Sequence, residues 1–270
     1  MSVGHYENFP VASLLLPERL RGPVSVIYRF ARSADDFADE GDLSASRRLA
    51  LLEGYRAELD RLEAGLPPAT PLFRELGPVI AAHRLPFAPF YDLLDAFTQD
   101  VTKQRYASFA EVMAYCRRSA DPVGRLMLCL YGRSDAENVA ASDSVCSALQ
   151  LINFWQDIEL DFLKNRVYLP QDEMERFGVS EAQIAARDVS GGWWNLMRFQ
   201  IERARALLLS GAPLAARLPG RIGLEIGTVV QGGLRILEKL ERARGDMFRH
   251  RPALKTLDWL LVFCRAVMAR

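Results

Sequence analysis

The sequence predicts an all-α protein, and three observations carry this prediction. Apolar residues recur at three- and four-residue steps through nearly the whole chain, without a convincing run in which they alternate with polar ones. Half of the 270 residues are hydrophobic, which is enough to build a sizeable core. The breaks in the pattern are short, and none is a long polar linker. We therefore expect a single-domain helix bundle over residues 1–270.

The helical periodicity divides the chain into recognisable segments. Residues 43–65 repeat Leu and Ala at helical spacing and end at a glycine, which is typical of a helix C-terminus. Residues 142–165 are predicted to form one long helix with a broad apolar stripe. Residues 221–245 form another, weakened by adjacent glycines at 232 and 233. The apolar C-terminal segment, 256–270, is interpreted as a helix that docks on the bundle.

Composition excludes several classes of function. Lys and Arg number 34, as do Asp and Glu, so there is no basic excess for binding nucleic acid. The four cysteines have neither metal-site nor disulfide-like spacing, and the three histidines are scattered. Any metal would therefore have to be held by oxygen. We expect no secretory signal and no membrane span, and a cytoplasmic location, with a place at the inner face of the membrane left open.

The first candidate site is the stretch "SADDFADEGD", residues 33–42, with five acidic side chains in ten positions. On a helix, residues three or four apart share a face, so like charges here repel one another. Tyr28, Arg32, Asp35, Asp36 and Asp39 fall on one broad side of the predicted helix. Taken alone, this segment is also compatible with a solvated acidic face.

The second candidate is "NFWQDIELDFLKNRVYLP", residues 153–170. Asn153, Asp157 and Asp161 lie at i, i+4 and i+8, so they form an oxygen-bearing stripe among large apolar side chains. Arg166 and Tyr168 follow the end of the helix. A polar stripe beside so much hydrophobic surface indicates a site rather than a solvated face.

Two acidic stripes on separate helices suggest a metal–diphosphate site. Mg²⁺ prefers carboxylate oxygens, water and phosphate oxygens, so facing carboxylates could hold several ions that attract a diphosphate. Arg32, Lys164 and Arg166 could contact the same anion. Such a site makes diphosphate a good leaving group, and the carbocation left behind needs a central apolar cavity that excludes water.

At these residues the chain resembles the squalene/phytoene synthase family of class I isoprenoid synthases. "YRFARSADDFADE" is similar to the first aspartate-rich motif of the family and "NFWQDIELDFLKNRVYLP" to the second. The resemblance implies that the metal is held by Asp35, Asp36, Asp39, Asn153, Asp157 and Asp161, the aspartates among them also being catalytic. It implies that substrate is bound by Tyr28, Arg32, Gln150, Asn153, Lys164, Arg166 and Tyr168.

Within the family, the segments "HYENFPVASLLLP" and "SADPVGRLML" are most similar to a bacterial subgroup of hopanoid biosynthesis. This resemblance implies a carbon–oxygen lyase that converts presqualene diphosphate, an isoprenoid diphosphate, to hydroxysqualene and diphosphate, with water as the nucleophile. It implies dependence on Mg²⁺, with Mn²⁺ as a substitute, and no nicotinamide cofactor. Substrate transfer from the preceding presqualene diphosphate synthase and peripheral contact with the membrane are left open.

Two departures from the family pattern separate this reaction from condensation. Where condensing members carry Ala-Gly after "Y-C", this chain has Asp121-Pro122, and near the N-terminus it has Glu7-Asn8-Phe9 in place of serines. Both changes favour an enzyme that starts from the already joined intermediate. Two alternatives stay open: a prenyl transferase that joins two allylic diphosphates head to head, and a non-catalytic binding protein.

Several single residues carry weaker interpretations. Tyr115 aligns with a family tyrosine near the reacting centre and is a candidate for the catalytic set, or else a core tyrosine. Phe9 is predicted in the wall of the substrate pocket. Gly232 and Gly233 either allow close helix approach or leave room for an isoprenoid chain. Trp193 and Trp194 either pack under their loop or dip into a membrane surface.

Overall fold

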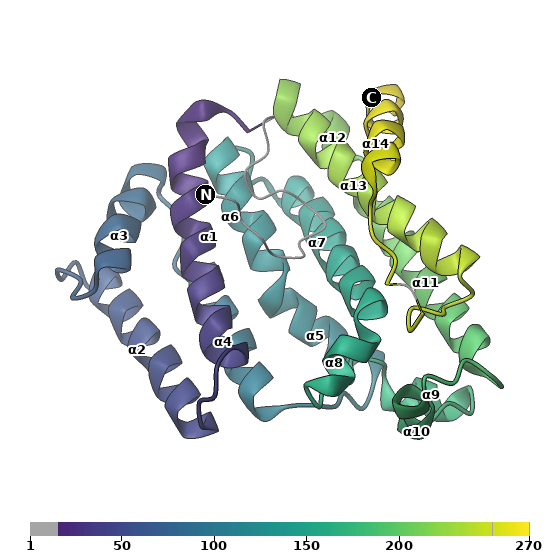
Figure 1. Ribbon diagram of the computed structural model, residues 1–270. Helices are drawn as coiled ribbons and strands as arrows, with labels where there is room; N and C mark the ends of the chain where they lie inside the picture. Colours follow the sequence, from purple (N-terminus) through teal and green to yellow (C-terminus); the bar gives the residue numbers. More distant parts are fainter. Residues whose placement is uncertain (1–15, 250, 270) are drawn as a thin grey trace.

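The computed structural model describes residues 16–249 and 251–269, and this part of the chain folds as a single all-helical domain (Figure 1). The fold class predicted from the sequence is confirmed. The helices are α1 (Glu18–Asp39), α2 (Ala45–Glu63), α3 (Pro71–His83), α4 (Ala88–Thr102), α5 (Phe109–Ser119), α6 (Asp121–Tyr131), α7 (Ala136–Gln156), α8 (Ile158–Leu163), α9 (Gln171–Arg176), α10 (Glu181–Ala186), α11 (Trp193–Gly211), α12 (Leu214–Arg217), α13 (Gly220–Arg242) and α14 (Thr256–Met268).

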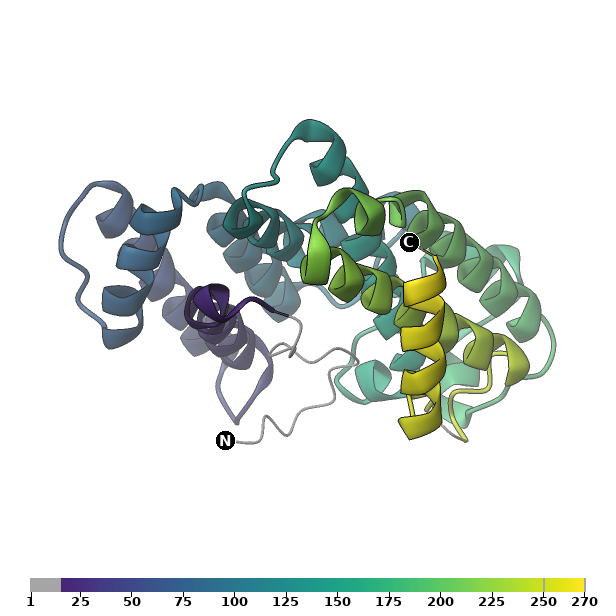
Figure 2. The same ribbon diagram turned by 90° about the horizontal axis from the view of Figure 1, so that it is seen from above.

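Two large hydrophobic clusters and a smaller third one, which joins α12 to α6, α7 and α13, hold the described helices together. One joins α1 to α4 with α6, and Phe30 of α1 lies near its centre, in edge contact with Phe73 and Phe90. The other joins α5, α7, α11 and α13 around the fully buried Trp155 and Trp193. Seen from above, α2 and α3 lie at one side of the molecule, and α11, α13 and α14 lie at the other (Figure 2). The acidic segments of α1 and α8 therefore belong to different halves of the core.

The prediction of one helix over residues 142–165 is wrong at Asp157. This residue has φ −107° and ψ 14°, outside the helical range, and it separates α7 from α8. The break is shallow, because the N–H of Asp157 still donates to the Asn153 carbonyl (2.9 Å) and that of Asp161 to the Asp157 carbonyl (2.8 Å). Helix kinks have identifiable local causes, and this one changes the direction of the chain at a charged residue of the second motif.

The structure decides between the alternatives at Trp193 and at Gly233. Trp193 is buried and its indole N–H donates to the Gly245 carbonyl (2.9 Å), so it packs inside the molecule and does not dip into a membrane. A Cβ placed on Gly233 would lie 2.8 Å from a methyl group of Leu208, so this glycine allows α13 to approach α11 closely. None of the helices in the described ranges has the length and apolar character needed to cross a membrane.

Candidate active site

The carboxyl end of α1 meets the segment that follows α8, and Asp39 is the point of contact. Lys164 Nζ donates to Asp39 Oδ2 at 3.0 Å, and the Arg166 guanidinium pairs with the other carboxylate oxygen. These ion pairs link positions more than 120 residues apart in the chain. The structure therefore brings the first acidic motif against the basic end of the second.

Arg32 pairs with the other two aspartates of the first motif. Its guanidinium contacts Asp35 at 3.1 Å and Asp36 at 2.7 Å, one helical turn further along α1. All three side chains are partly exposed, so the charges remain accessible to a ligand. The expected shared face of α1 is therefore present, with a cation and two carboxylates side by side.

The segment carrying Lys164 and Arg166 is fixed from outside the site. The Val167 N–H donates to the Gln104 carbonyl (2.9 Å), which makes an isolated parallel bridge between Val167 and Arg105. Arg105 itself pairs with Glu181 (2.6 Å) and donates to the Asn165 carbonyl. Arg105 thus anchors the loop that presents Arg166 and Tyr168.

Asp157 has a partner that the sequence motifs did not reveal. Arg251, in the segment between α13 and α14, pairs with both of its carboxylate oxygens, and the Nη2–Oδ2 distance is 3.0 Å. Because 94 residues separate the two, no local pattern could have indicated this contact. The kink at Asp157 is thus tied to Arg251, which precedes α14.

Carboxylates outnumber their cationic partners at the site, and this is visible in their pKa values. Burial, reinforced by Asp39, raises the pKa of Asp35 to about 6. Burial and the neighbouring Asp157 raise the pKa of Asp161 to about 8. For Asp39 the effect of burial is outweighed by the hydrogen bonds from Arg166 and Lys164, so its pKa is lowered. A surplus of desolvated carboxylates is typical of a site that binds cations.

Asp100 of α4 is a buried carboxylate that the sequence interpretation missed. It accepts hydrogen bonds from the hydroxyls of Tyr115 (2.8 Å) and Tyr168 (3.4 Å), and its backbone carbonyl accepts one from Arg166 (3.1 Å). Burial raises its pKa to about 7, although Arg166 and Tyr115 oppose the shift. The available signal was its register: Asp100 follows the buried Phe97 by three residues, so it continues the apolar face of α4.

Aromatic rings line the side of the site next to Asp100. Phe154 and Tyr168 stack with ring centroids 3.8 Å apart and planes within 7°. Tyr106 stacks on Tyr168 at 5.4 Å, and Tyr115 lies 5.7 Å from the same ring. Such π faces can stabilise a neighbouring cation.

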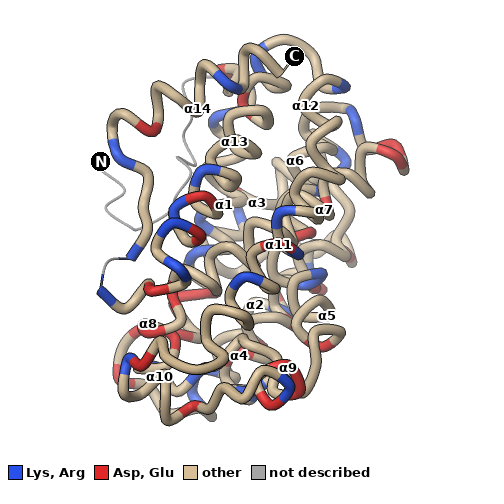
Figure 3. Tube along the Cα trace, turned by 90° about the vertical axis from the view of Figure 1, so that its right-hand side faces the viewer, with Lys and Arg blue, Asp and Glu red and all other residues tan. Residues whose placement is uncertain are grey.

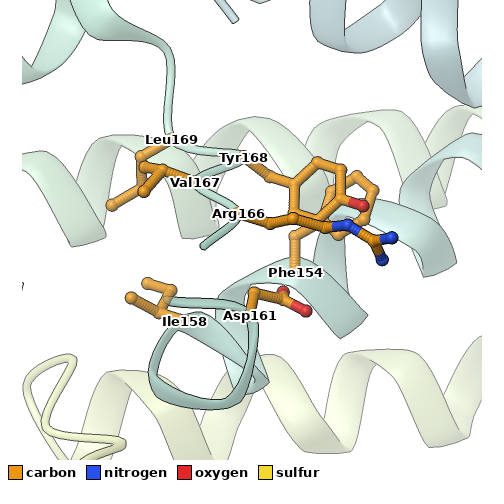
Figure 4. A pocket seen from close by; sticks show the side chains of 7 residues that line it. All are labelled: Phe154, Ile158, Asp161, Arg166, Val167, Tyr168 and Leu169. Atoms are coloured by element: carbon orange, nitrogen blue, oxygen red, sulfur yellow. The ribbon is translucent and has the colours of Figure 1, made fainter. Parts of the chain in front are cut away.

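Two pockets open next to these groups. One is bounded by Asp161, Arg166 and Tyr168, whose polar ends point to the same side, while Ile158 and Leu169 lie on the other (Figure 4). The second has a volume of about 240 Å³ and is lined by Asp39, Asp100, Lys164 and Arg166 among others. Neither is a large apolar cavity, so the predicted central cavity stays a prediction.

The remaining predicted residues lie around this centre. Tyr28 on α1 and Gln150 and Asn153 on α7 are half-buried, and Gln150 lies one turn before Asn153. Phe9 lies outside the described residues.

The donor chemistry suits a hard cation, but the metal ligands are not assembled. Oδ1 of Asp36 faces the Arg32 guanidinium and Oδ1 of Asp39 faces that of Arg166, and each carboxylate oxygen has a further lone pair that could bind an ion. Within residues 16–249 and 251–269, however, no three His, Cys, Asp or Glu side chains converge closely enough to hold one. Asp39 and Asp157 are paired with Lys164, Arg166 and Arg251 instead, and these ion pairs would have to open for an ion to bind.

Comparison with known proteins decides the family. The model of the family described as squalene/phytoene synthase matches residues 3–258. The chain belongs to the squalene/phytoene synthase family. Members of this family act on isoprenoid diphosphates and typically depend on Mg²⁺.

Individual relatives refine this placement. The chain is 37% identical to a hydroxysqualene synthase of Rhodopseudomonas palustris over 257 residues, which is 94% of this chain and 86% of the relative. A phytoene synthase of Arthrospira platensis is 28% identical, over 96% of this chain and 86% of the relative. Among solved structures, a squalene synthase from Alicyclobacillus acidocaldarius superimposes with a TM-score of 0.82 at 38% identity, covering 89% of this chain and 90% of the other.

Proposed function

We propose that this squalene/phytoene synthase family member is a Mg²⁺-dependent hydroxysqualene synthase. It would ionise presqualene diphosphate and add water, giving hydroxysqualene and diphosphate. The observation that carries the proposal is the meeting of Asp39 with Lys164 and Arg166, which brings the acidic motif of α1 against two cations that could bind a diphosphate. The relatives named hydroxysqualene synthase, 37% identical over 94% of the chain, support the choice of substrate.

The proposed metal ligands are Asp35, Asp36, Asp39, Asn153, Asp157 and Asp161. Bound Mg²⁺ would neutralise the diphosphate and stabilise the charge that develops as it leaves. Carboxylates with raised pKa values, such as those of Asp35 and Asp161, are held in an environment short of positive charge. A bound metal ion would supply the positive charge that the surroundings of Asp35 and Asp161 lack.

The chain's own cations would orient the diphosphate. Arg166 is partly buried beside Asp39, and its fork of N–H donors suits a phosphate oxygen pair. Lys164, whose side chain is half exposed, could swing from Asp39 to the same anion. Arg32, which pairs with Asp35 and Asp36 on α1, would bind the diphosphate from the side of that helix. Tyr28, Gln150 and Asn153 are proposed to complete the binding surface.

The aromatic rings would protect the carbocation until water adds. Phe154 and Tyr168 form a stacked pair whose faces favour positive charge and whose apolar surface excludes bulk solvent. Tyr115 is the candidate that positions the attacking water. Because its hydroxyl donates to Asp100, its oxygen keeps lone pairs free to accept a hydrogen bond from that water. The oxygen of the water would form the new C–O bond, and its proton would pass to solvent or diphosphate.

One observation keeps the condensing alternative open. Asp121 begins α6, is buried, and accepts a hydrogen bond from the Ser147 hydroxyl (2.7 Å). The departure from the family pattern at this position therefore serves helix packing as well, and it does not by itself exclude the joining of two allylic diphosphates. Phytoene synthases are 28–30% identical to this chain over most of its length, which supports retaining the condensing reaction as an alternative.

Product analysis separates the reactions. Purified protein with Mg²⁺ is incubated with presqualene diphosphate or with farnesyl diphosphate, in separate reactions without nicotinamide, and the lipids are identified by mass spectrometry. We expect an alcohol from presqualene diphosphate and no consumption of farnesyl diphosphate. Consumption of farnesyl diphosphate would assign the protein to the condensing enzymes, and no turnover of either substrate would favour a binding protein.

A further inference from the structure

The outer face of α14 is an apolar surface that no other element of the described residues covers. The helix contacts the rest of the protein through a narrow strip, Asp258, Val262 and Ala266, spaced four residues apart and buried against α13. The far side carries Leu257, 81% exposed, and Met268, 86% exposed, at its two ends. Exposed large apolar side chains between them complete this surface: Leu260, Leu261, Phe263 and Val267.

This concentration is unusual for a surface that faces water. Isolated exposed leucines are normal, whereas a contiguous group on one short helix marks a contact with another apolar phase or partner. In Figure 3 the tube of α14 is largely uncharged, at the edge of the molecule. Docking on the bundle, the role interpreted from sequence, explains only the buried strip.

The charge around α14 indicates what covers it. Residues 242–270 contain seven Lys and Arg against two Asp and Glu, a net charge of +5 in a chain whose net charge is zero. Arg249 is 83% exposed at its side chain, and Arg242, Arg244 and Lys255 are exposed without a carboxylate partner among the described residues. Basic residues beside an exposed apolar helix face are the combination that binds an anionic lipid surface.

The contacts between α13 and α14 place these basic residues next to the apolar face. Arg235 (2.7 Å) and Lys239 of α13 pair with Asp258 in the first turn of α14. The carboxyl end of α13, with Arg242, therefore adjoins the start of α14, with Lys255. An apolar helix with cations gathered at one end could lie in the headgroup region with its leucines inserted.

We propose that the outer face of α14, with the basic residues of 242–255, binds the surface of a membrane that contains anionic phospholipids. A second copy of the chain is a poorer occupant, because a two-fold interface here would bring the basic residues Arg242, Arg244 and Lys255 of two copies together. The proposal does not rest on the reaction assigned above, although an enzyme with isoprenoid substrates would benefit from it. It moves the membrane contact from Trp193 and Trp194, at the start of α11, to the last helix, α14.

Cosedimentation of the full chain with lipid vesicles tests the proposal. We expect binding to vesicles of equal parts phosphatidylglycerol and phosphatidylcholine, and at least about ten-fold weaker binding to pure phosphatidylcholine. The triple variant Leu257→Gln, Leu260→Gln, Val267→Gln should lower binding to the anionic vesicles at least about ten-fold. The pair Arg242→Gln, Lys255→Gln should reduce the preference for anionic lipid.

Control variants change exposed residues outside α14. Leu66→Gln with Leu209→Gln removes two leucines that are about half exposed outside α14, and Arg117→Gln with Arg118→Gln removes two exposed arginines of α5. Both controls should bind vesicles like the wild type. Circular dichroism checks that every variant is folded, and since vesicle binding needs no turnover, failure of the proposed reaction would leave this test intact.

Two results would overturn the proposal. One is the absence of binding to anionic vesicles, or binding that the triple variant leaves unchanged. The other is a dimer in sedimentation equilibrium that the triple variant converts to monomer while vesicles bind neither protein, which would make the surface an interface between copies of the chain.

Discussion

Carboxylates that lie between helices behave in opposite ways in two regions of this molecule. At the junction of α13 and α14, Asp258 is surrounded by Arg235, Lys239 and the Lys255 N–H. Burial alone would raise its pKa, but these partners outweigh it and the pKa is lowered. Between α1 and α8, Asp35 and Asp161 are also desolvated, yet carboxylates outnumber cations there and their pKa values are raised to about 6 and about 8.

The difference separates a structural ion pair from a site. A carboxylate with surplus cations stabilises the fold in the absence of any ligand. Carboxylates held together with too little positive charge lower the stability of the folded state, and such arrangements persist where a ligand supplies the missing charge. We therefore expect substitutions in the first region to affect stability and those in the second to affect activity.

The largest effect is expected at Asp39. Asp39→Asn removes the charge that gathers Lys164 and Arg166, and we expect kcat for presqualene diphosphate to fall by about 10³-fold or more. The matched control is Asp42→Asn, since Asp42 belongs to the same acidic run but is exposed. Steady-state product formation measures both. Activity of the Asp39 variant within a few-fold of wild type would mean that this junction is not the site.

Asp258→Asn should lower the stability of the protein and leave its activity unchanged, in contrast to Asp39→Asn. The substitution leaves Arg235 and Lys239 without their shared carboxylate, and we expect a loss of about 2–3 kcal/mol in the free energy of unfolding. Urea titration monitored by circular dichroism measures this loss. Turnover in the absence of denaturant should stay near wild type. A large fall in kcat with unchanged stability would contradict the distinction between the two regions.

Asp121 offers a test by pH, because it is buried with a hydroxyl partner and burial raises its pKa to about 7. Below about pH 4 both folded and unfolded chains carry the proton. As pH rises to about 7, the unfolded chain releases it and the folded chain retains it, so the contribution of Asp121 to stability falls. Asp121→Asn should therefore gain about 2 kcal/mol relative to wild type between about pH 5 and pH 8. The test is the urea concentration at the midpoint of unfolding, measured for wild type and variant at about pH 5 and about pH 8. If the midpoint changes equally with pH in both proteins, Asp121 is not the titrating group.

The sequence was informative where the relevant residues share one helix. The face of α1 with Arg32, Asp35 and Asp36 follows from three- and four-residue spacing, and the structure retains it. The kink at Asp157 was not predicted, and the Arg251 that pairs with this residue lies 94 residues away, beyond the reach of any local pattern. The spacing of apolar residues in the sequence shows which side of a helix is apolar. It does not identify the residue that pairs with a single charged side chain from another part of the chain.

Asp100 is the other residue that pattern reasoning passed over, and it gives the smallest expected effect. If Asp100 holds the hydroxyls of Tyr115 and Tyr168 in place, it acts through them as a positioning residue. Asp100→Asn preserves its size but weakens the hydrogen bond from Tyr115, and we expect about ten-fold lower kcat with KM nearly unchanged. Asp95→Asn, on the same helix and paired with Arg56, is the control and should leave both constants unchanged. A rise in KM without a change in kcat would assign Asp100 to binding of the substrate, and Tyr115→Phe should then be equally harmless to kcat.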